Sequence, residues 1–330
     1  MRLFVLKGVL TAILGIVYGF ASFCSAQEQE PCNAQEQAPC NAQELAPEQE
    51  PNEIERMKAK YEVANSIADL TPTVCAAAGV EAPTTVTANK IESVLTPMSE
   101  AFEGRPAKRV FIYCADCIGD VLLQNHAEDF VDALKESDAT IKSTNVMATC
   151  TPVCYATIFC GAGPELHGIK TYRKPVVKEA TLFDSFLASG KKIAIVAQEG
   201  STVDTIFRER NIDYYHFPTD AEAVDKAIEL VRSSDYDLIV LHDCEYDTAM
   251  HQFGTEAQEA VDARQTVLRR WVDIAKATDE AWSDCDRLNV FAADHGSHMP
   301  EGATAGAHGA DVYEDAVVNH FYRWRVANSK

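Results

Sequence analysis

Short apolar runs alternate with stretches of helical periodicity over most of the chain after residue 105. The apolar runs are rich in β-branched and aromatic residues, and they predict strands at Arg109–Cys114, Lys192–Ala197, Tyr214–Phe217, Asp237–His242 and Asn289–Ala293. Apolar residues at helical spacing predict helices at Glu128–Lys135, Thr181–Ala188, Ser201–Glu209, Asp220–Arg232 and Glu256–Trp282, and a helical tail from Asp315.

This alternation predicts an α/β fold with a mostly parallel central sheet and helices on both faces. In such sheets, ligands bind beyond the carboxyl ends of the strands. Acidic and imidazole side chains follow three of the predicted strands. Asp116 comes just after the first strand, and Asp247 follows the strand that ends at His242. Asp294 and His295 follow the last strand. A packed core does not require this arrangement, so we expect a functional site at that edge.

Composition adds the size of the core and the sign of the surface charge. The chain has 330 residues, of which 47% are hydrophobic, and this is enough for one large domain. The formal net charge is −21, and a negative surface repels phosphate backbones, so no nucleic-acid polymer is expected as a partner. A small phosphorylated substrate is compatible with this charge, because bound cations make a pocket locally positive.

The N-terminus has the features of a secretory signal. Residues 1–26 begin with Arg2 and Lys7, continue with an almost wholly apolar stretch and end in small residues. We therefore expect a secreted or cell-envelope protein with no membrane span once the signal is cleaved. An uncleaved anchor is the alternative. A true start at Met57 would instead give a cytoplasmic protein.

The remaining chain divides by composition into three parts. Residues 27–56 repeat the sequence Pro-Cys-Asn-Ala-Gln-Glu and have no hydrophobic period, which predicts a low-complexity linker. Residues 57–104 form an N-terminal extension, and residues 105–330 form the predicted catalytic domain.

The 11 cysteines leave the redox setting open. In a secreted protein they would suggest disulfides. Buried free thiols are the alternative, because cysteine often packs as a small apolar residue. Many of the cysteines lie in or near the predicted strand ends: Cys114, Cys117, Cys150, Cys154, Cys160 and Cys244.

Two sequence spacings bring together side chains that bind metals. Asp247 and His251 are four residues apart, so on a helix both point to one face, although a solvated pair would show the same spacing. Asp294 and His295 precede Gly296, and a glycine allows the tight turn that two adjacent ligands need to converge.

His308 adds an imidazole in a loop of small residues. His298 is predicted to contact the ligands without binding a metal itself. Histidine and carboxylate ligands suit zinc, and Mn²⁺ is also compatible. A divalent ion lowers the pKa of a bound hydroxyl, and a second ion ~4 Å away polarises the substrate. We therefore expect two divalent metal ions, with the ligands Asp116, Asp247, His251, Asp294, His295 and His308.

The segment Thr151–Ile169 resembles the nucleophile segment of the alkaline phosphatase superfamily. It is most similar to the type I phosphodiesterase/nucleotide pyrophosphatase branch, in which a threonine precedes Gly-x-x-Pro-x-x-His-Gly-Ile. That run stands here at Gly161–Ile169, which places Thr151 at the nucleophile position. The family's other motifs occur in the same order, as the Asp after the first strand, Asp-x-x-x-His, Asp-His-Gly and a late His-Gly.

The resemblance implies a two-metal phosphoric-ester hydrolase, either a phosphodiesterase/nucleotide pyrophosphatase or a phosphomonoesterase. Thr151 would attack phosphorus and form a phospho-threonine intermediate. One metal would be held by Asp247, His251 and His308. The other would be held by Asp116, Asp294, His295 and the Thr151 oxygen. The short segment between Thr171 and Asp237 leaves no room for a large cap domain.

This chain departs from the branch at Cys154, where the branch has an asparagine that helps to bind a phosphoryl oxygen. A thiol is a weak donor, so Cys154 is a candidate substrate contact that leaves the choice between mono- and diester open. A sulfatase is an alternative, because Cys150 and Pro152 begin its Cys-x-Pro-x-Arg motif, although the arginine is missing. A non-catalytic, metal-stabilised binding protein on the same fold is a second alternative.

Overall fold

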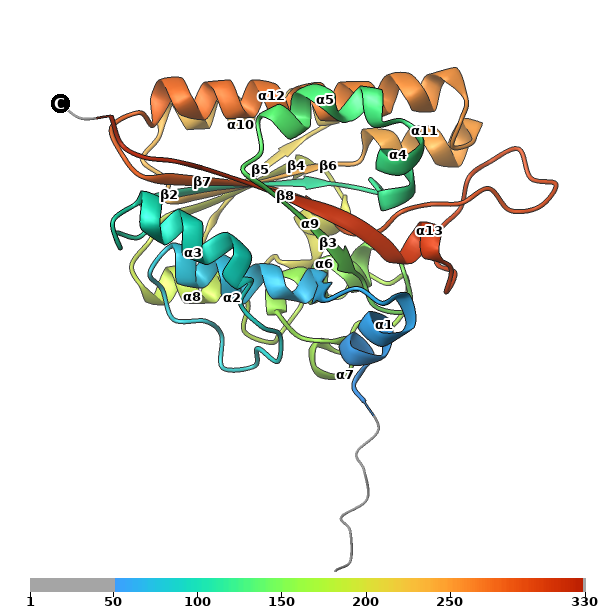
Figure 1. Cartoon of the computed structure of the whole chain (residues 1–330), viewed down its shortest axis with the longest axis horizontal. Coiled ribbons are helices and arrows are strands. Elements are labelled where there is room, and N and C mark those ends of the chain that lie inside the picture. The colour runs from blue at the N-terminus through green and yellow to red at the C-terminus, as the bar shows by residue number, and fades with distance from the viewer. Residues whose placement is uncertain (1–50, 329–330) are drawn as a thin grey trace, which may run out of the picture. The chain divides into compact units, whose positions relative to one another are not determined.

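The computed structural model describes residues 51–328. The predicted signal at 1–26 and most of the predicted linker at 27–56 therefore lie outside the described residues. An eight-stranded sheet organises the described part, in the order β1-β3-β8-β7-β2-β6-β4-β5 (Figure 1). The strands are β1 Asn65–Ser66, β2 Arg109–Ala115, β3 Ala139–Thr144, β4 Ile193–Gln198, β5 Asp213–Phe217, β6 Leu238–Asp243, β7 Arg287–Ala293 and β8 Val317–Arg325.

Helices cover both faces of this sheet, which confirms the predicted fold class (Figure 1). One face carries α4 Asp120–Asn125, α5 Ala127–Lys135, α10 Asp220–Ser233, α11 Glu245–Phe253 and α12 Gln258–Ala281. The other carries α2 Leu70–Ala77, α3 Glu92–Ala101, α6 Thr151–Cys160 and α8 Leu182–Ala188. The remaining helices are short or lie near the edge of the sheet: α1 Glu53–Tyr61, α7 Pro164–His167, α9 Thr202–Ile206 and α13 Tyr313–Ala316. Within residues 51–328, no helix is both long and apolar enough to span a bilayer.

The predicted helical tail is wrong. Beyond the one-turn helix α13, the chain forms β8, which pairs antiparallel with both β7 and β3. The segment is rich in valine and aromatic residues, which favour strands. It also pairs on both sides, so its backbone forms hydrogen bonds with both β3 and β7. The sequence also gave no signal for β3, where polar residues interrupt the apolar pattern.

The central strands β2, β6 and β7 are buried along nearly their whole length. Strands covered on both faces need apolar side chains on both, which is why their sequences read as continuous apolar runs. The helices from residues 57–104 contribute Ile67, Leu70 and Val74 to the same core as these strands. The N-terminal extension therefore packs as part of the described fold.

The register of the sheet brings the predicted ligands to one edge. Ala115 at the end of β2 pairs with Asp243 of β6 and with Ala293 of β7. The residues that follow β2 and β7, Asp116 and Asp294, therefore leave the sheet side by side.

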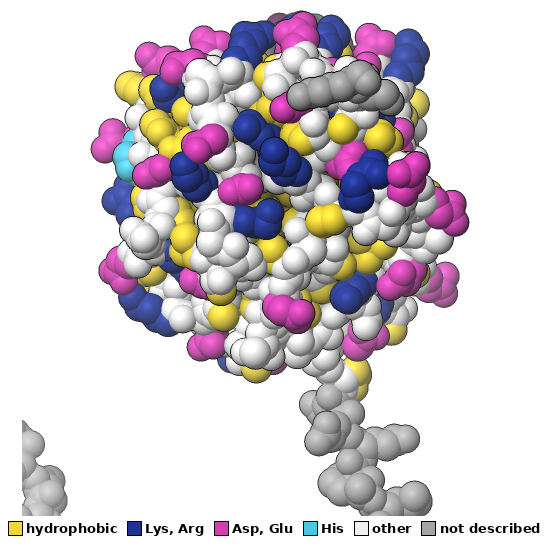
Figure 2. Space-filling model, turned by 90° about the vertical axis from the view of Figure 1, so that its left-hand side faces the viewer, with side chains coloured by type: hydrophobic (Ala, Val, Ile, Leu, Met, Phe, Trp, Pro, Cys, Tyr) yellow, Lys and Arg dark blue, Asp and Glu magenta, His cyan; other side chains and the backbone are white. Residues whose placement is uncertain are grey.

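The opposite edge, at which β2 and β7 begin, has a mixed surface charge. Basic and acidic side chains are interspersed on this side of the molecule (Figure 2). Arg105, which precedes β2, is an example, because it forms ion pairs with Glu103 and Asp286.

Phe321 of β8 tests the strand that the sequence did not predict. It is 1% exposed and stacks on Phe291 of β7 with ring centroids 4.9 Å apart. We expect Phe321→Ala to lower the free energy of unfolding by about 3–5 kcal/mol, because it opens a cavity between two strands. Val326→Ala, at a 41% exposed position, should change it by less than about 0.5 kcal/mol. Urea denaturation measures both, and equal effects would contradict the packing of β8.

Candidate metal centre

All six predicted metal ligands meet at the carboxyl edge of the sheet. Asp116 and Asp294 leave β2 and β7, while the helix α11 carries both Asp247 and His251. The donor atoms fall into two overlapping groups, each with atoms within 4.8 Å of one another: Asp116 with Asp294 and His295, and Asp247 with His295 and His308. The sixth side chain, His251, lies beside Asp247, with 3.4 Å between Nε2 and Oδ1.

The three candidate histidine ligands share one pattern of hydrogen bonds. In each of them Nδ1 bonds a backbone carbonyl oxygen, and the pairs are His251 with Gly306 at 3.1 Å, His295 with Gly296 at 3.0 Å, and His308 with Thr149 at 3.0 Å. A carbonyl oxygen only accepts, so each Nδ1 must carry the proton and donate it. Each Nε2 is then left with a lone pair, which is the arrangement that a metal-binding imidazole needs.

The carboxylates complement these lone pairs. Among the described residues, Asp116 Oδ1, Asp247 Oδ1 and Asp294 Oδ2 are buried oxygens without a hydrogen-bond partner. The first and third lie 3.5 and 3.3 Å from His295 Nε2. Asp247 Oδ1 lies 3.6 Å from His308 Nε2. Two acceptors that face each other cannot share a hydrogen bond, whereas a cation between them satisfies both. The residues therefore fit divalent metal ions.

Burial also shifts the protonation of these groups. It raises the pKa of Asp116 to about 7, that of Asp247 to about 6, and that of Asp294 well above its usual value. Burial lowers the pKa of His295 and of His308. A cation in the cluster favours ionised carboxylates and neutral imidazoles, so it would compensate the cost of burying three acids together.

Gly296 makes the turn after Asp294 and His295 possible. A Cβ at this position would meet the backbone oxygen of Glu314 at 2.0 Å and the Cα of Gly119 at 2.9 Å. No side chain fits at those distances, so this turn needs a glycine for its close approach to two backbones.

Thr151 stands beside the ligands at the start of α6. Its side chain is nearly buried, and Oγ1 lies 3.2 Å from His295 Nε2. Pro152 occupies the first turn, where a missing N–H costs no helical hydrogen bond. Gly161 ends the helix in the left-handed conformation, with φ of 63°. The N-terminus of α6 therefore points its partial positive charge at this site, which favours an anion.

The two other predicted site residues have different surroundings. Cys154 is fully buried one turn further along α6, so its thiol has no exposed surface. His298 bonds Asp315 Oδ1 through Nδ1 at 2.8 Å, and its backbone pairs with Ala307 beside His308. His298 thus supports the loop that carries one candidate ligand.

The cysteines of the described residues are free thiols. Seven of these eight are buried, and Cys244 is partly exposed. Within residues 51–328, the packing interpretation of the cysteines therefore holds.

The sequence did not reveal the residues behind Asp116. His242, the penultimate residue of β6, is fully buried, with Nε2 3.2 Å from Asp116 Oδ2 and Nδ1 3.2 Å from Ser201 Oγ. The thiol of Cys244 lies 3.5 Å from the same Nε2. The one available signal was a histidine at the carboxyl end of an otherwise apolar strand.

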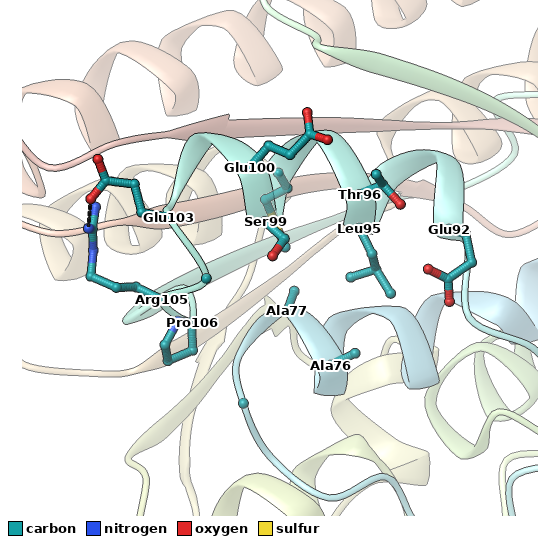
Figure 3. A pocket seen from close by; sticks show the side chains of 13 residues that line it. Ala76, Ala77, Glu92, Leu95, Thr96, Ser99, Glu100, Glu103, Arg105 and Pro106 are labelled. Atoms are coloured by element: carbon teal, nitrogen blue, oxygen red, sulfur yellow. Dashed lines mark hydrogen bonds and ion pairs between the residues drawn. The ribbon is translucent and has the colours of Figure 1, made fainter.

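A surface groove of about 740 Å³ lies elsewhere. The helices α2 and α3 and the residues that precede β2 line it (Figure 3). Its charged side chains are those of Glu92, Glu100, Glu103 and Arg105, and Arg105 is paired with Glu103 at one end of the groove. Its lining contains none of the six candidate ligands, so groove size does not identify the chemistry of this protein.

No family model and no curated protein matches the chain, but several solved structures do. Murine ectonucleotide pyrophosphatase/phosphodiesterase 5 in complex with AMP is 18% identical, with a TM-score of 0.47 over 59% of each chain. Phosphonoacetate hydrolase from Sinorhizobium meliloti 1021 is 17% identical, with a TM-score of 0.46 over 62% of this chain and 61% of its own. The periplasmic domain of phosphoethanolamine transferase EptC from Campylobacter jejuni is 13% identical, with a TM-score of 0.48 over 66% of this chain and 80% of its own.

These neighbours are members of the alkaline phosphatase superfamily, which the sequence motifs also resemble. The chain spans about three fifths of the length of the first two.

Asp294 tests the metal centre directly. We expect Asp294→Asn to lower the zinc content of the purified protein by one ion, because an amide oxygen is a weaker ligand than a carboxylate. Metal analysis by mass spectrometry after equilibration with zinc measures this content. Asp129→Asn is the control, since this acid pairs with Arg264 away from the centre. Unchanged zinc content in Asp294→Asn would remove Asp294 from the ligand set.

Proposed function

We propose that this protein is a two-metal hydrolase of small phosphoric esters in which Thr151 is the nucleophile. The position of the Thr151 hydroxyl carries the proposal. Oγ1 lies 3.2 Å from His295 Nε2, inside a cluster of imidazole and carboxylate lone pairs that face each other without hydrogens between them. A hydroxyl alone would be a poor nucleophile, and this setting is suited to activating it.

The ligands divide between two ions, which we propose to be zinc, with manganese as the substitute. Asp247, His251 and His308 would hold one, and Asp116, Asp294 and His295 would hold the other. His295 lies within 4.8 Å of donors from both groups, which supports two neighbouring ions. When bound, two such ions would lower the pKa of a coordinated hydroxyl and would stabilise the negative charge of the phosphoryl group and the leaving oxygen.

The protein's own groups supply the remaining chemistry. Thr151 Oγ1 loses its proton to solvent and forms a bond to phosphorus while the bond from phosphorus to the leaving oxygen breaks, and the leaving oxygen takes up a proton from solvent. Water then attacks the phosphorus of the resulting phospho-threonine, and the bond from phosphorus to Oγ1 breaks. This step restores the threonine hydroxyl and releases phosphate from a monoester substrate or a phosphomonoester from a diester substrate. The N-terminus of α6 places a partial positive charge beside the phosphoryl oxygens in both steps.

The choice between mono- and diester rests on a panel of substrates. Cys154 stands where the related branch has a donor to a phosphoryl oxygen, and its buried thiol is a weak donor. We expect turnover of at least one member of a panel that contains a phosphomonoester, a phosphodiester and a dinucleotide pyrophosphate, in zinc or in manganese. Turnover of a sulfate ester alone would instead support the sulfatase alternative. Tight zinc binding without turnover of any ester would support the binding protein.

Thr151 tests the nucleophile. We expect Thr151→Ala to lower kcat on the best substrate by at least about 1000-fold, because the attacking oxygen is lost while the other ligands remain. Zinc content should stay at two ions per chain. Thr151→Ser keeps the hydroxyl and is the matched control, so it should retain measurable turnover. Wild-type kcat in Thr151→Ala would show that another group attacks phosphorus.

A further inference from the structure

We propose that His242 is a positioning residue of the metal centre, which holds the Asp116 carboxylate so that one oxygen faces the ions. The proposal rests on the metal centre proposed above and does not depend on which ester is the substrate. It concerns a histidine on a strand of the central sheet, next to the strand that Asp116 follows.

The two oxygens of Asp116 have different surroundings. Oδ1 has no hydrogen-bond partner and lies 3.5 Å from His295 Nε2, in the cluster of candidate ligands. Oδ2 lies 3.2 Å from His242 Nε2, on the other side. A contact to one oxygen fixes the rotation of the carboxyl group, and the other oxygen is thereby directed at the ions.

The hydrogen bonds around His242 determine which nitrogen carries the proton. With a cation at Oδ1, Asp116 is ionised and only accepts hydrogen bonds, so Nε2 must donate to it. Nδ1 then accepts a hydrogen bond from the hydroxyl of Ser201, 3.2 Å away. The line from Ser201 through His242 to Asp116 is thus fully hydrogen-bonded.

Packing fixes the plane of the ring. Tyr155 meets the His242 ring edge to face, with centroids 5.0 Å apart and an angle of 83°. Tyr155 lies on α6, the helix that begins with Thr151, and Ser201 immediately precedes α9. His242 is therefore held by two further elements as well as by its own strand. A rigid donor of this kind suits a residue that orients a ligand.

A third ion is the competing explanation. The donors of Asp116, His242 and Cys244 lie within 4.8 Å of one another, and the thiol is 3.5 Å from Nε2. However, both nitrogens of His242 and Asp116 Oδ2 already have hydrogen-bond partners. The two clusters assigned to metals contain buried carboxylate oxygens without hydrogen-bond partners. The cluster of Asp116, His242 and Cys244 adds no such oxygen, because Asp116 Oδ1 faces His295 and not His242. The hydrogen-bonded arrangement is therefore favoured.

Zinc affinity and stoichiometry test the proposal without an activity assay. We expect His242→Leu to weaken binding of one of the two zinc ions by about 10–100-fold in a titration against a competing chelator, as loss of a hydrogen bond to a metal ligand commonly does. His242→Gln should recover most of this affinity, because its amide nitrogen reaches a similar position and donates. Ser201→Ala should have a smaller effect in the same direction.

His167 provides the matched control. It is 6% exposed and its ring bonds Thr157, so it is a buried, hydrogen-bonded histidine like His242. His167→Leu should therefore destabilise the fold without changing zinc affinity.

Three results would overturn the proposal. Wild-type zinc affinity in a folded His242→Leu protein is the first. Three ions in the wild type and two in His242→Leu would make His242 a ligand. If His242→Leu does not fold, Ser201→Ala and His242→Gln decide. The proposal then fails if Ser201→Ala binds both zinc ions with wild-type affinity and His242→Gln binds only one zinc ion. If no ester is hydrolysed and the His242 effect on zinc remains, the proposed function fails and the positioning role stands.

Discussion

The described site depends on one electrostatic constraint, which is that buried lone pairs on oxygen and nitrogen face each other with no hydrogen between them. Backbone carbonyls hold the Nδ1–H of all three candidate histidine ligands, so every Nε2 is committed as an acceptor. The carboxylate oxygens opposite them lack partners as well. Such an arrangement is costly without cations, because charge is buried and polar atoms remain unsatisfied. Much of the local architecture follows from the need to place these atoms where they can bind the same ions.

The sheet supplies that placement. Parallel strands β2, β6 and β7 end in register, so the acid after β2 and the acid after β7 emerge together, while β6 provides the histidine behind one of them. The helix α11 then contributes an acid and a histidine one turn apart, and α6 brings in a hydroxyl at its N-terminus. Several elements distant in sequence thus converge on one small volume, and each contributes what its local geometry makes easiest.

The sequence predicted much of this fold, for identifiable reasons. The central strands are apolar on both faces, so their runs were clear, and the acids that follow them marked the functional edge. The prediction failed at β8, because a pattern of valine, aromatic and arginine residues does not reveal that the strand pairs on both sides. His242 was missed for a similar reason. Its part in the site arises from its contact with Asp116, which follows the neighbouring strand β2. The two residues are far apart in the sequence, so their spacing does not predict this contact.

The position of β8 also has a consequence for how the chain folds. Strand β3 pairs only with β1 and β8 within the described sheet, so β8 joins this pair to the remaining strands. Pairing between residues so far apart in sequence is slow, because the entropy of closing a long loop must be overcome before the strands gain their hydrogen bonds. The loop that carries His308 immediately precedes α13 and β8. Before β8 pairs, the β1–β3 pair would have no connection to the remaining strands, and the loop with His308 would not be fixed beside the other candidate ligands.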